Sequence, residues 1–503
     1  MNLTIDDWIP VQMRDGSARR VSLRGVFAEG HDIADLAVRP HERIALMRLL
    51  ICIAQAALKG PADHEEWQES LEHLPAAADR YLAEQMGAFN LFDPERPFLQ
   101  IAGLKKEDAT AASKLNFALA TGNNSTLFDN SGAGEPRAFE PARLALMLLA
   151  FQCFSVGGTI GTARWGGRLT LGGSESGPGN SGHAPCTPSS MLHAFVRRHD
   201  LLATTHANLL AKSAVGDSYK REWGYPVWER PPASLGDTPA IQNATQTYLG
   251  RLVPLARAVL LRPDRRELLL ANGLDYPSFP EFAAEPSATI VRRRDKEEHY
   301  PLGASTKAIW RLLPALVVRR KAGLAGGALT LANLDDARPF DLWVGALVSD
   351  KASILDTTEG VLHVPPQMLT DVSRAEYEEE VEIAERKAST LGAAIVKWRE
   401  LADGAWPGKV KSDPKARAKL QAAAARHYWM AVERSLSHLH ACIDGEGEAR
   451  EAARSAWRQT LRAAALAAYE MACSRATPRQ MRAFALGRAQ LTRIPKPTAE
   501  PTA

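Results

Sequence analysis

The 503-residue sequence lacks both the long apolar run of a membrane protein and the basic leader of a secreted one. No stretch of about 18 apolar residues occurs, which predicts that no segment spans a membrane. The first residues, MNLTIDDWIPV, are acidic and lack the basic start and apolar run of a signal peptide. We therefore expect a cytoplasmic protein without a membrane partner.

Cysteine is scarce, and no Cys-x-x-Cys pair occurs. Scattered cysteines in apolar or Ala-rich runs are typical of buried free thiols rather than of a disulfide framework. The 13 histidines form neither a His-x-x-x-His nor a His-Glu-x-x-His pair. We therefore expect no metal site. The five cysteines are Cys52, Cys153, Cys186, Cys442 and Cys473.

Nucleotide-binding and catalytic motifs are also missing. The one conspicuous glycine-rich segment, FSVGGTIGTARWGG at 154–167, is called the glycine stretch below. It lacks the lysine and hydroxyl residue of a P-loop, and it follows a predicted helix rather than the strand of a dinucleotide site. Two interpretations remain open: a purely structural loop, or a loop whose bare backbone approaches another chain or a groove.

No acid–base pair suggests an enzyme. The adjacent carboxylates Glu378, Glu379 and Glu380 are predicted to lie, solvated, on the polar face of a helix. We expect no catalytic residue and no cofactor.

The N-terminal part mixes strand and helix patterns. Alternating residues on both sides of the turn RDGS predict a β-hairpin, with its second strand over 18–27. Helical periodicity predicts helices over 40–60, 63–88 and 140–154. Two long loops, 122–139 and 167–188, are rich in Gly, Ser, Asn and Pro, and loops of this length are usually functional or disordered.

After Pro366 the pattern becomes helical throughout. Four amphipathic segments between Asp371 and Arg493 predict an up-down four-helix bundle. The predicted fold class is α+β: a large, irregular mixed N-terminal domain over 1–365, then the bundle over 371–493. The last residues, 494–503, are expected to be disordered.

Charge is spread unevenly along the chain. From Arg386 to the C-terminus there are 21 Lys and Arg against 10 Asp and Glu, an excess of 11 positive charges. The remainder is acidic, because the whole chain carries only +3. This asymmetry indicates either a polyanionic partner for the C-terminal segment or a solvated, arginine-rich helical surface.

The order of several segments resembles a known family, the large subunit (CasA) of the type I-E CRISPR Cascade surveillance complex. The resemblance spans nearly the whole length, and the ordered set carries it rather than any single motif. The segments are MNLTIDDWIPV, RIALMRLLICIAQAAL, SVGGTIGTARWGG, YLGRLVPLARAVLL, LWVGALVSDKASIL, RHYWMAVE and ALGRAQL.

This resemblance implies a non-catalytic subunit at one end of a guide-RNA complex. Such a subunit recognises the protospacer-adjacent motif of double-stranded target DNA from the minor groove, promotes duplex opening and R-loop formation, and docks the helicase-nuclease. Guide pairing then reads sequence, while protein reads a short duplex element. The implied partners are the other Cascade subunits, the CRISPR guide RNA, the target DNA and the helicase-nuclease.

The resemblance also implies site residues. Gly157 and Gly158 match the family's glycine loop and would press against the minor groove. The loop over 122–139, called the guide loop below, would contact the guide RNA and the rest of the complex through Phe128, Asp129 and Asn130.

A second group of implied residues surrounds the motif. Lys351 occupies the position of the family's wedge, a glutamine in its known form, between Asp350 and Ala352. Asp350 stands where an asparagine is expected, so the preferred motif can differ. Arg266, six residues before Asn272, matches a basic finger that enters the minor groove.

Basic residues elsewhere would act through phosphate, independently of sequence. Some members of the family carry a cysteine cluster between residues 215 and 290, where this chain has none, so no zinc is expected. The candidate phosphate contacts are Arg164, Lys397, Arg399, Lys409, Lys411 and Arg426.

Two other functions stay open at this stage. A nucleotide- or cofactor-dependent enzyme would have to use the glycine stretch without the usual lysine or metal ligands. A helical scaffold that only bridges protein partners would show no dependence on DNA sequence.

Overall fold

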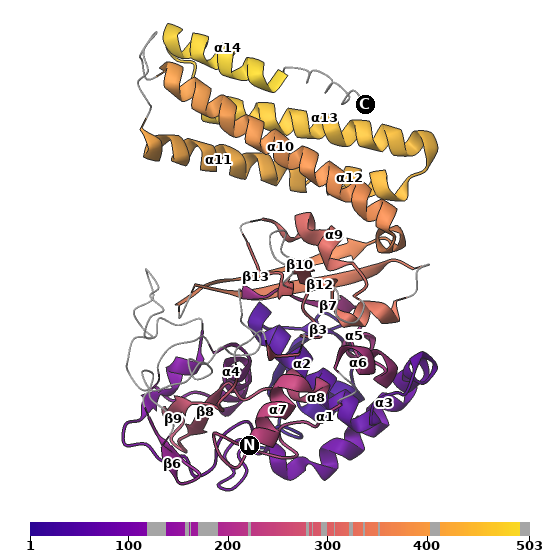
Figure 1. The fold of residues 1–503 in the computed structure, drawn as a ribbon, viewed down its shortest axis with the longest axis vertical. Coiled ribbons are helices and arrows are strands. Elements are labelled where there is room, and N and C mark those ends of the chain that lie inside the picture. Colours follow the sequence, from indigo (N-terminus) through magenta and orange to yellow (C-terminus); the bar gives the residue numbers. More distant parts are fainter. Residues whose placement is uncertain are drawn as a thin grey trace. The chain divides into compact units, whose positions relative to one another are not determined.

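The computed structural model describes residues 1–117, 137–155, 160, 162–169, 190–219, 223–277, 281–283, 285–292, 299–305, 307–320, 325–334, 338–350, 353–402 and 413–492. The chain forms two compact units, Met1–Val364 and Pro365–Ala503 (Figure 1). The first mixes helices and strands and the second is helical, so the predicted α+β class is confirmed. Within the described residues, no helix is long and apolar enough to cross a membrane.

The predicted N-terminal hairpin is present, but its second strand is shorter than expected. Strand β1 (Ile9–Met13) pairs with β2 (Ala18–Val21) on one side and β3 (Ile33–Leu36) on the other. The prediction of a strand continuing through residue 27 is wrong. The Ser22 hydroxyl accepts a hydrogen bond from the Gly25 N–H at 3.1 Å and so caps helix α1 (Leu23–Ala28).

Three long helices form the centre of the first unit, as the periodicity predicts. They are α2 (Pro40–Leu58), α3 (His64–Glu84) and α4 (Pro141–Phe154). Helix α2 packs against both α3 and α4, and both α2 and α4 are buried over most of their length. Helices that are apolar on every face belong in the interior of a large domain.

Besides the N-terminal sheet, the described residues form two further three-stranded sheets, which lie on this helical centre. One has the order β13-β12-β7, from β7 (His193–Arg197), β12 (Phe340–Asp350) and β13 (Ser353–Val364), and α2 packs on it. The other has the order β4-β9-β8, from β4 (Thr110–Ala111), β8 (Arg257–Leu261) and β9 (Glu267–Asn272). Both sheets are antiparallel.

Short elements complete the described part of the first unit. The strand pairs are β5 (Arg164–Trp165) with β6 (Arg168–Leu169), and β10 (Ile290–Arg292) with β11 (His299–Pro301). The helices are α5 (Leu201–Ala207), α6 (Lys212–Ser218), α7 (Thr238–Gln246), α8 (Tyr248–Leu252) and α9 (Leu313–Leu316).

A fully buried group of charges joins distant parts of this unit. Glu285 forms ion pairs with Arg48 of α2 and with Arg251 of α8, the latter at 3.2 Å, and none of the three side chains is more than 1% exposed. Arg48 also donates through Nε to the Leu252 carbonyl at 2.9 Å. Burial by itself would raise the pKa of Glu285, but the two guanidinium groups outweigh it and lower the pKa to about 2.

Replacing this carboxylate should destabilise the first unit strongly. Glu285→Gln leaves two buried guanidinium groups without their anion, and breaking a buried pair in this way costs about 3–5 kcal/mol. The free energy of unfolding, measured by urea titration with tryptophan fluorescence, should fall by that amount. Glu107→Gln, at an exposed position, is the control and should leave it unchanged. Equal values for the two variants would contradict the assignment.

The second unit is a bundle with one interruption that the sequence pattern did not predict. Its helices are α10 (Asp371–Ala402), α11 (Pro414–Glu433), α12 (Leu436–Asp444), α13 (Gly447–Ala472) and α14 (Pro478–Thr492). The second of the four predicted segments is thus two helices, α11 and α12. Helices α10 and α11 run antiparallel: Tyr428 Oη donates to the Ala384 carbonyl and Gln421 Nε2 to that of Gly392.

One carboxylate of this bundle is buried rather than solvated. Glu380, expected on the polar face, is 3% exposed in its side chain and accepts from Arg458 Nη2 at 2.6 Å. Arg454 lies 3.5 Å from the same oxygen. The prediction of a solvated Glu380 is therefore wrong, because two arginines of α13 cover it.

Candidate nucleic-acid interface

The predicted wedge position lies at the end of a long β-hairpin. Strands β12 and β13 pair antiparallel from Phe340–Val364 at one end to Asp350–Ser353 at the other. At about 3.4 Å per residue, the 11-residue strand β12 is roughly 35 Å long. Asp350 is thus the last paired residue before the hairpin tip, while Lys351 and Ala352 fall outside the described residues.

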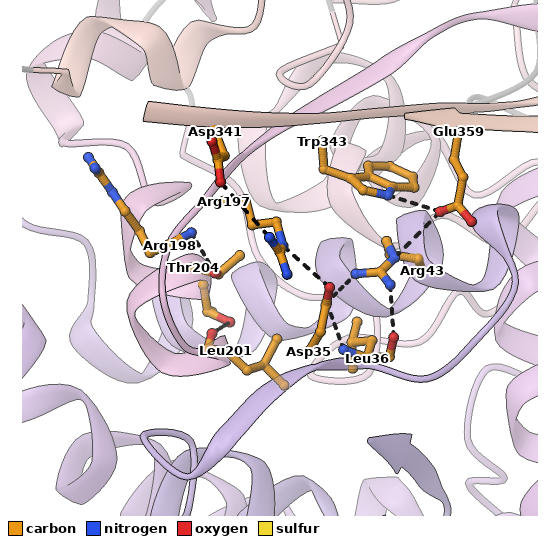
Figure 2. A network of polar contacts seen from close by, with 11 residues as sticks. Asp35, Leu36, Arg43, Arg197, Arg198, Leu201, Thr204, Asp341, Trp343 and Glu359 are labelled. Carbon is orange, nitrogen blue, oxygen red and sulfur yellow. Dashed lines mark hydrogen bonds and ion pairs between the residues drawn. The ribbon is translucent and has the colours of Figure 1, made fainter. Parts of the chain in front are cut away.

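The opposite end of the hairpin is fixed by a polar network, called the base network below (Figure 2). Arg43 of α2 pairs with Asp35 of β3, and its Nη2 donates to the Leu36 carbonyl at 2.8 Å. The same guanidinium lies 5.4 Å from the centre of the Trp343 ring, and Trp343 Nε1 donates to Glu359 at 3.0 Å. Hairpin, helix and N-terminal sheet are therefore joined through one arginine.

A second arginine extends the base network along β7. Arg197 Nε lies 3.4 Å from Asp35, and its Nη1 lies 3.9 Å from Asp341 of β12 (Figure 2). On the other side, His363 Nδ1 is 3.0 Å from Asp341. The charges of the base network thus lie close to the Phe340–Val364 end of the hairpin, far from Asp350.

A β-bulge lies between the base and the tip. Val348 pairs with Asp356 and Ser349 with Ile354, which leaves Leu355 as the extra residue, and its side chain is 64% exposed. Ser190 holds the neighbouring backbone: its hydroxyl donates to the Ser349 carbonyl at 3.1 Å and accepts from the Ser349 N–H at 2.9 Å. Bulges often redirect a side chain beside a functional site.

Sequence reasoning missed Leu355. Bulges have no reliable sequence signature, and the alternation of ILDTTEG is too short to reveal the shift. The only available signal was a large apolar residue close to the predicted wedge.

The beginning of the glycine stretch lies one strand away from this hairpin. Helix α4 ends at Phe154, whose ring lies edge to face against that of His193 with a centroid distance of 5.9 Å. His193 belongs to β7 and pairs with Gly345 of β12. Gly157 and Gly158 themselves lie outside the described residues, so their assignment stays a prediction.

Arg257 of β8 fixes the residue from which the glycine stretch departs. Its buried guanidinium donates from Nε to the Ser155 hydroxyl at 3.0 Å and from Nη1 to Asn272 Oδ1 at 3.1 Å. Gln152 accepts from the Arg257 N–H and donates to its carbonyl, both at 3.0 Å. Burial lowers the pKa of Arg257 to about 10, which leaves it charged at neutral pH. No motif pointed to this residue.

Removing the Arg257 guanidinium should loosen the end of α4. In Arg257→Met the Ser155 hydroxyl loses a charge-assisted bond of about 1.5–3 kcal/mol. The Ser155 amide, which donates to the Phe151 carbonyl at 2.8 Å, should exchange with deuterium at least tenfold faster. The control is Arg262→Ala, which changes an exposed residue one strand length away on the same hairpin. In this variant the Ser155 amide should exchange at the rate of the unmodified chain. Unchanged exchange in Arg257→Met would refute this role.

Arg266 lies at the other end of the same hairpin. The Asp264 carboxylate accepts from the Arg266 N–H at 2.9 Å, which closes the turn between β8 and β9. The Arg266 carbonyl accepts from the Ala112 N–H at 2.7 Å, and the Arg265 carbonyl accepts from the Phe139 N–H at 3.2 Å. The turn therefore touches the last residue of the guide loop.

The structure thus groups Arg266 with the guide loop rather than with the start of the glycine stretch. The five-residue strand β8 separates the Arg257 end from this turn by roughly 17 Å. Phe128, Asp129 and Asn130 lie outside the described residues, and their assignment stays a prediction.

The candidate phosphate contacts divide between the two units. Arg164 is exposed on β5, at the end of the glycine stretch. In the second unit, Lys397 and Arg426 are exposed on α10 and α11, while Arg399 is half-buried. Arg426 lies between Gln421 and Tyr428, which contact Gly392 and Ala384, so it is about three helical turns from Lys397 along the bundle. Lys409 and Lys411 lie outside the described residues.

Among the described residues, no group of three or more His, Cys, Asp or Glu side chains is arranged to hold a metal ion. The geometry instead offers a fixed hairpin, an anchored glycine stretch and an arginine-bearing turn.

Comparison with known proteins agrees with the resemblance. Residues 2–468 match the family described as CRISPR-associated protein Cse1. A curated relative from Thermus thermophilus, "CRISPR-associated protein CasA/Cse1", is 26% identical over 500 residues and covers 93% of this chain and 91% of its own length.

Solved structures share the fold. A crystal structure of Thermus thermophilus CasA has a TM-score of 0.75 at 24% identity, covering 98% of both chains. A chain of a "CRISPR RNA-guided surveillance complex" has a TM-score of 0.68 at 19% identity, covering 98% of this chain and 99% of its own. Together with the family match over nearly the whole sequence, these likenesses confirm the resemblance: the chain belongs to the Cse1 family of CRISPR-associated proteins.

Proposed function

We propose that this chain is the large, non-catalytic subunit of an RNA-guided Cascade surveillance complex and that it reads a short motif in double-stranded DNA. The observation that carries the proposal is the β12–β13 hairpin, which is fixed at its base and extends to Asp350, one strand from the start of the glycine stretch. The match to the Cse1 family and the likeness to a surveillance-complex chain support the assembly.

The proposed reading of DNA uses two neighbouring elements. Gly157 and Gly158 let the backbone approach the minor groove, because they carry no side chain. Asp350 at the end of β12, together with Lys351 and Ala352 after it in the sequence, then separates the first base pair beyond the motif. Lys351 adds a positive charge that binds phosphate, and Asp350 accepts a hydrogen bond from the guanine amino group.

Leu355 adds an apolar surface beside this tip. Minor-groove proteins insert leucine and similar side chains between base steps to unstack them. An exposed leucine on a bulge close to the hairpin tip has the chemistry for this step, so we assign it to duplex opening together with Lys351. R-loop formation then proceeds by guide pairing.

The remaining partners are assigned to other surfaces. The guide loop, with Phe128, Asp129 and Asn130, contacts the guide RNA and neighbouring subunits, and the Arg265 carbonyl holds its last residue from the β8–β9 turn that also carries Arg266. Exposed cations of the bundle, Lys397 and Arg426 among them, bind phosphate without sequence preference. The helicase-nuclease docks on this subunit once the duplex is open.

A helical scaffold without DNA readout remains the second candidate. The bundle exposes several large apolar side chains, which favour protein contacts. They are Val372, Met430, Met471, Met481 and Leu486.

Flank selection distinguishes the two candidates. A guide-loaded complex lacking its large subunit is mixed with this chain and with duplexes that carry a randomised three-base flank, and bound duplexes are separated by gel shift and sequenced. DNA reading predicts enrichment of a few flanks and affinity that falls steeply with salt. If all flanks are recovered equally, and if adding the chain does not change the amount of bound duplex, only the scaffold function would remain.

The hairpin assignment has its own test. Leu355→Ser should reduce duplex opening about tenfold, measured by the fluorescence of 2-aminopurine in the first base pair beyond the flank, because it removes the apolar contact with the bases. Val361→Ser is the matched control: Val361 lies on the same strand, is 49% exposed and pairs with Trp343 near the hairpin base. Equal opening by both variants would remove Leu355 from the mechanism.

A further inference from the structure

A cavity beside Arg164 has features that none of the assigned roles uses. Its volume is about 600 Å³, within the range of pockets that enclose small ligands. It lies between β5, the segment 95–105 and the loop that follows Trp228. The cavity therefore opens where the glycine stretch ends, not at the hairpin tip.

Two cations stand side by side at this cavity. Lys105 and Arg164 exchange both backbone hydrogen bonds, at 2.9 and 2.8 Å, so they form a directly opposed antiparallel pair. Side chains opposed in this way emerge on the same face about 5 Å apart, and like charges there repel each other. Both residues are exposed and line the cavity.

Among the described residues, no carboxylate pairs with either of these two cations. Within the described parts of the chain, neither Lys105 nor Arg164 forms an ion pair, and the one acidic residue of the lining is Glu95. A third cation, Arg96, is directed by a hydrogen bond from its Nη2 to the Trp228 carbonyl at 3.1 Å. The lining thus carries three positive charges against one negative charge, which favours an anion.

Apolar side chains make up much of the rest of the described lining, two tryptophans among them. The Trp228 indole is fixed by donating to Tyr81 Oη at 2.8 Å. A cationic edge beside an apolar hollow suits a phosphate attached to a flat ring, and not a bare inorganic ion. The apolar side chains include Leu99, Ile101, Trp165, Val227, Trp228 and Leu255.

We propose that this cavity binds one nucleotide of single-stranded nucleic acid, with its phosphate between Lys105 and Arg164 and its base in the apolar hollow. The proposal rests on the proposed function only for the source of the strand, which is the guide RNA or the displaced DNA strand. It gives Arg164 a defined partner instead of a diffuse phosphate contact.

The test measures binding of the intact chain to fluorescein-labelled ten-nucleotide RNA and DNA oligomers by anisotropy, across a salt series. Lys105→Ala/Arg164→Ala should weaken binding at least tenfold at low salt. Affinity decreases with salt, and the magnitude of the slope of log affinity against log salt should decrease by about 0.7 to 1.4. This is the change expected for the loss of one or two phosphate contacts. The fold is preserved, because the bonds between residues 105 and 164 are made by the backbone.

Two variants separate the cavity from general surface charge. Arg168→Ala removes an exposed cation of the same β5–β6 hairpin that does not line the cavity, and should leave binding unchanged. Ala233→Trp fills the apolar hollow from an exposed position, and should weaken binding without changing the salt slope. If the double variant behaves like Arg168→Ala, or if Ala233→Trp binds normally, the proposal is wrong.

The two oligomers identify the source of the nucleotide. Tighter binding of RNA assigns the cavity to the guide, and tighter binding of DNA assigns it to the displaced strand. Flank selection by the reconstituted complex is a separate measurement. If motif reading fails there, oligomer binding that depends on Lys105 and Arg164 would still support the cavity.

Discussion

The ion pair between Arg43 and Asp35 is the interaction on which the presentation of the hairpin depends. Asp35 also meets Arg197, and Arg43 also meets Trp343 and Glu359, so two charged side chains join five elements. Solvent-exposed ion pairs contribute little to the free energy of unfolding, but both side chains of this pair are largely shielded from solvent. A two-stranded ribbon is only marginally stable alone, so it needs such a support to hold its far end in one place.

Much of the fold was predictable from local patterns. The apolar periodicity of α2, α3 and α4 and the turn after β1 are carried by residues close together in sequence, and these predictions are confirmed. The prediction of the second strand failed at Ser22. Its hydroxyl caps a helix, and this local hydrogen bond overrides the strand that the alternating pattern indicates. The break between α11 and α12 has no Gly or Pro to mark it.

The candidate site was less accessible to sequence reasoning, because its supports are non-local. Arg257 meets Ser155 and Gln152 more than a hundred residues away in the chain, and Glu380 is covered by arginines of another helix. Lys105 and Arg164 look like ordinary surface cations until the backbone pairs them. Family resemblance pointed to a wedge at residues 350–352 without indicating a hairpin, and the bulge at Leu355 follows from register alone.

The β8–β9 hairpin touches the end of the guide loop at its turn and the start of the glycine stretch at its other end. If a ligand of either loop moves this hairpin, the two binding events share a free energy. Under the proposed function this linkage would be mutual: a bound guide would alter the affinity for duplex DNA by the same factor by which the duplex alters the affinity for the guide.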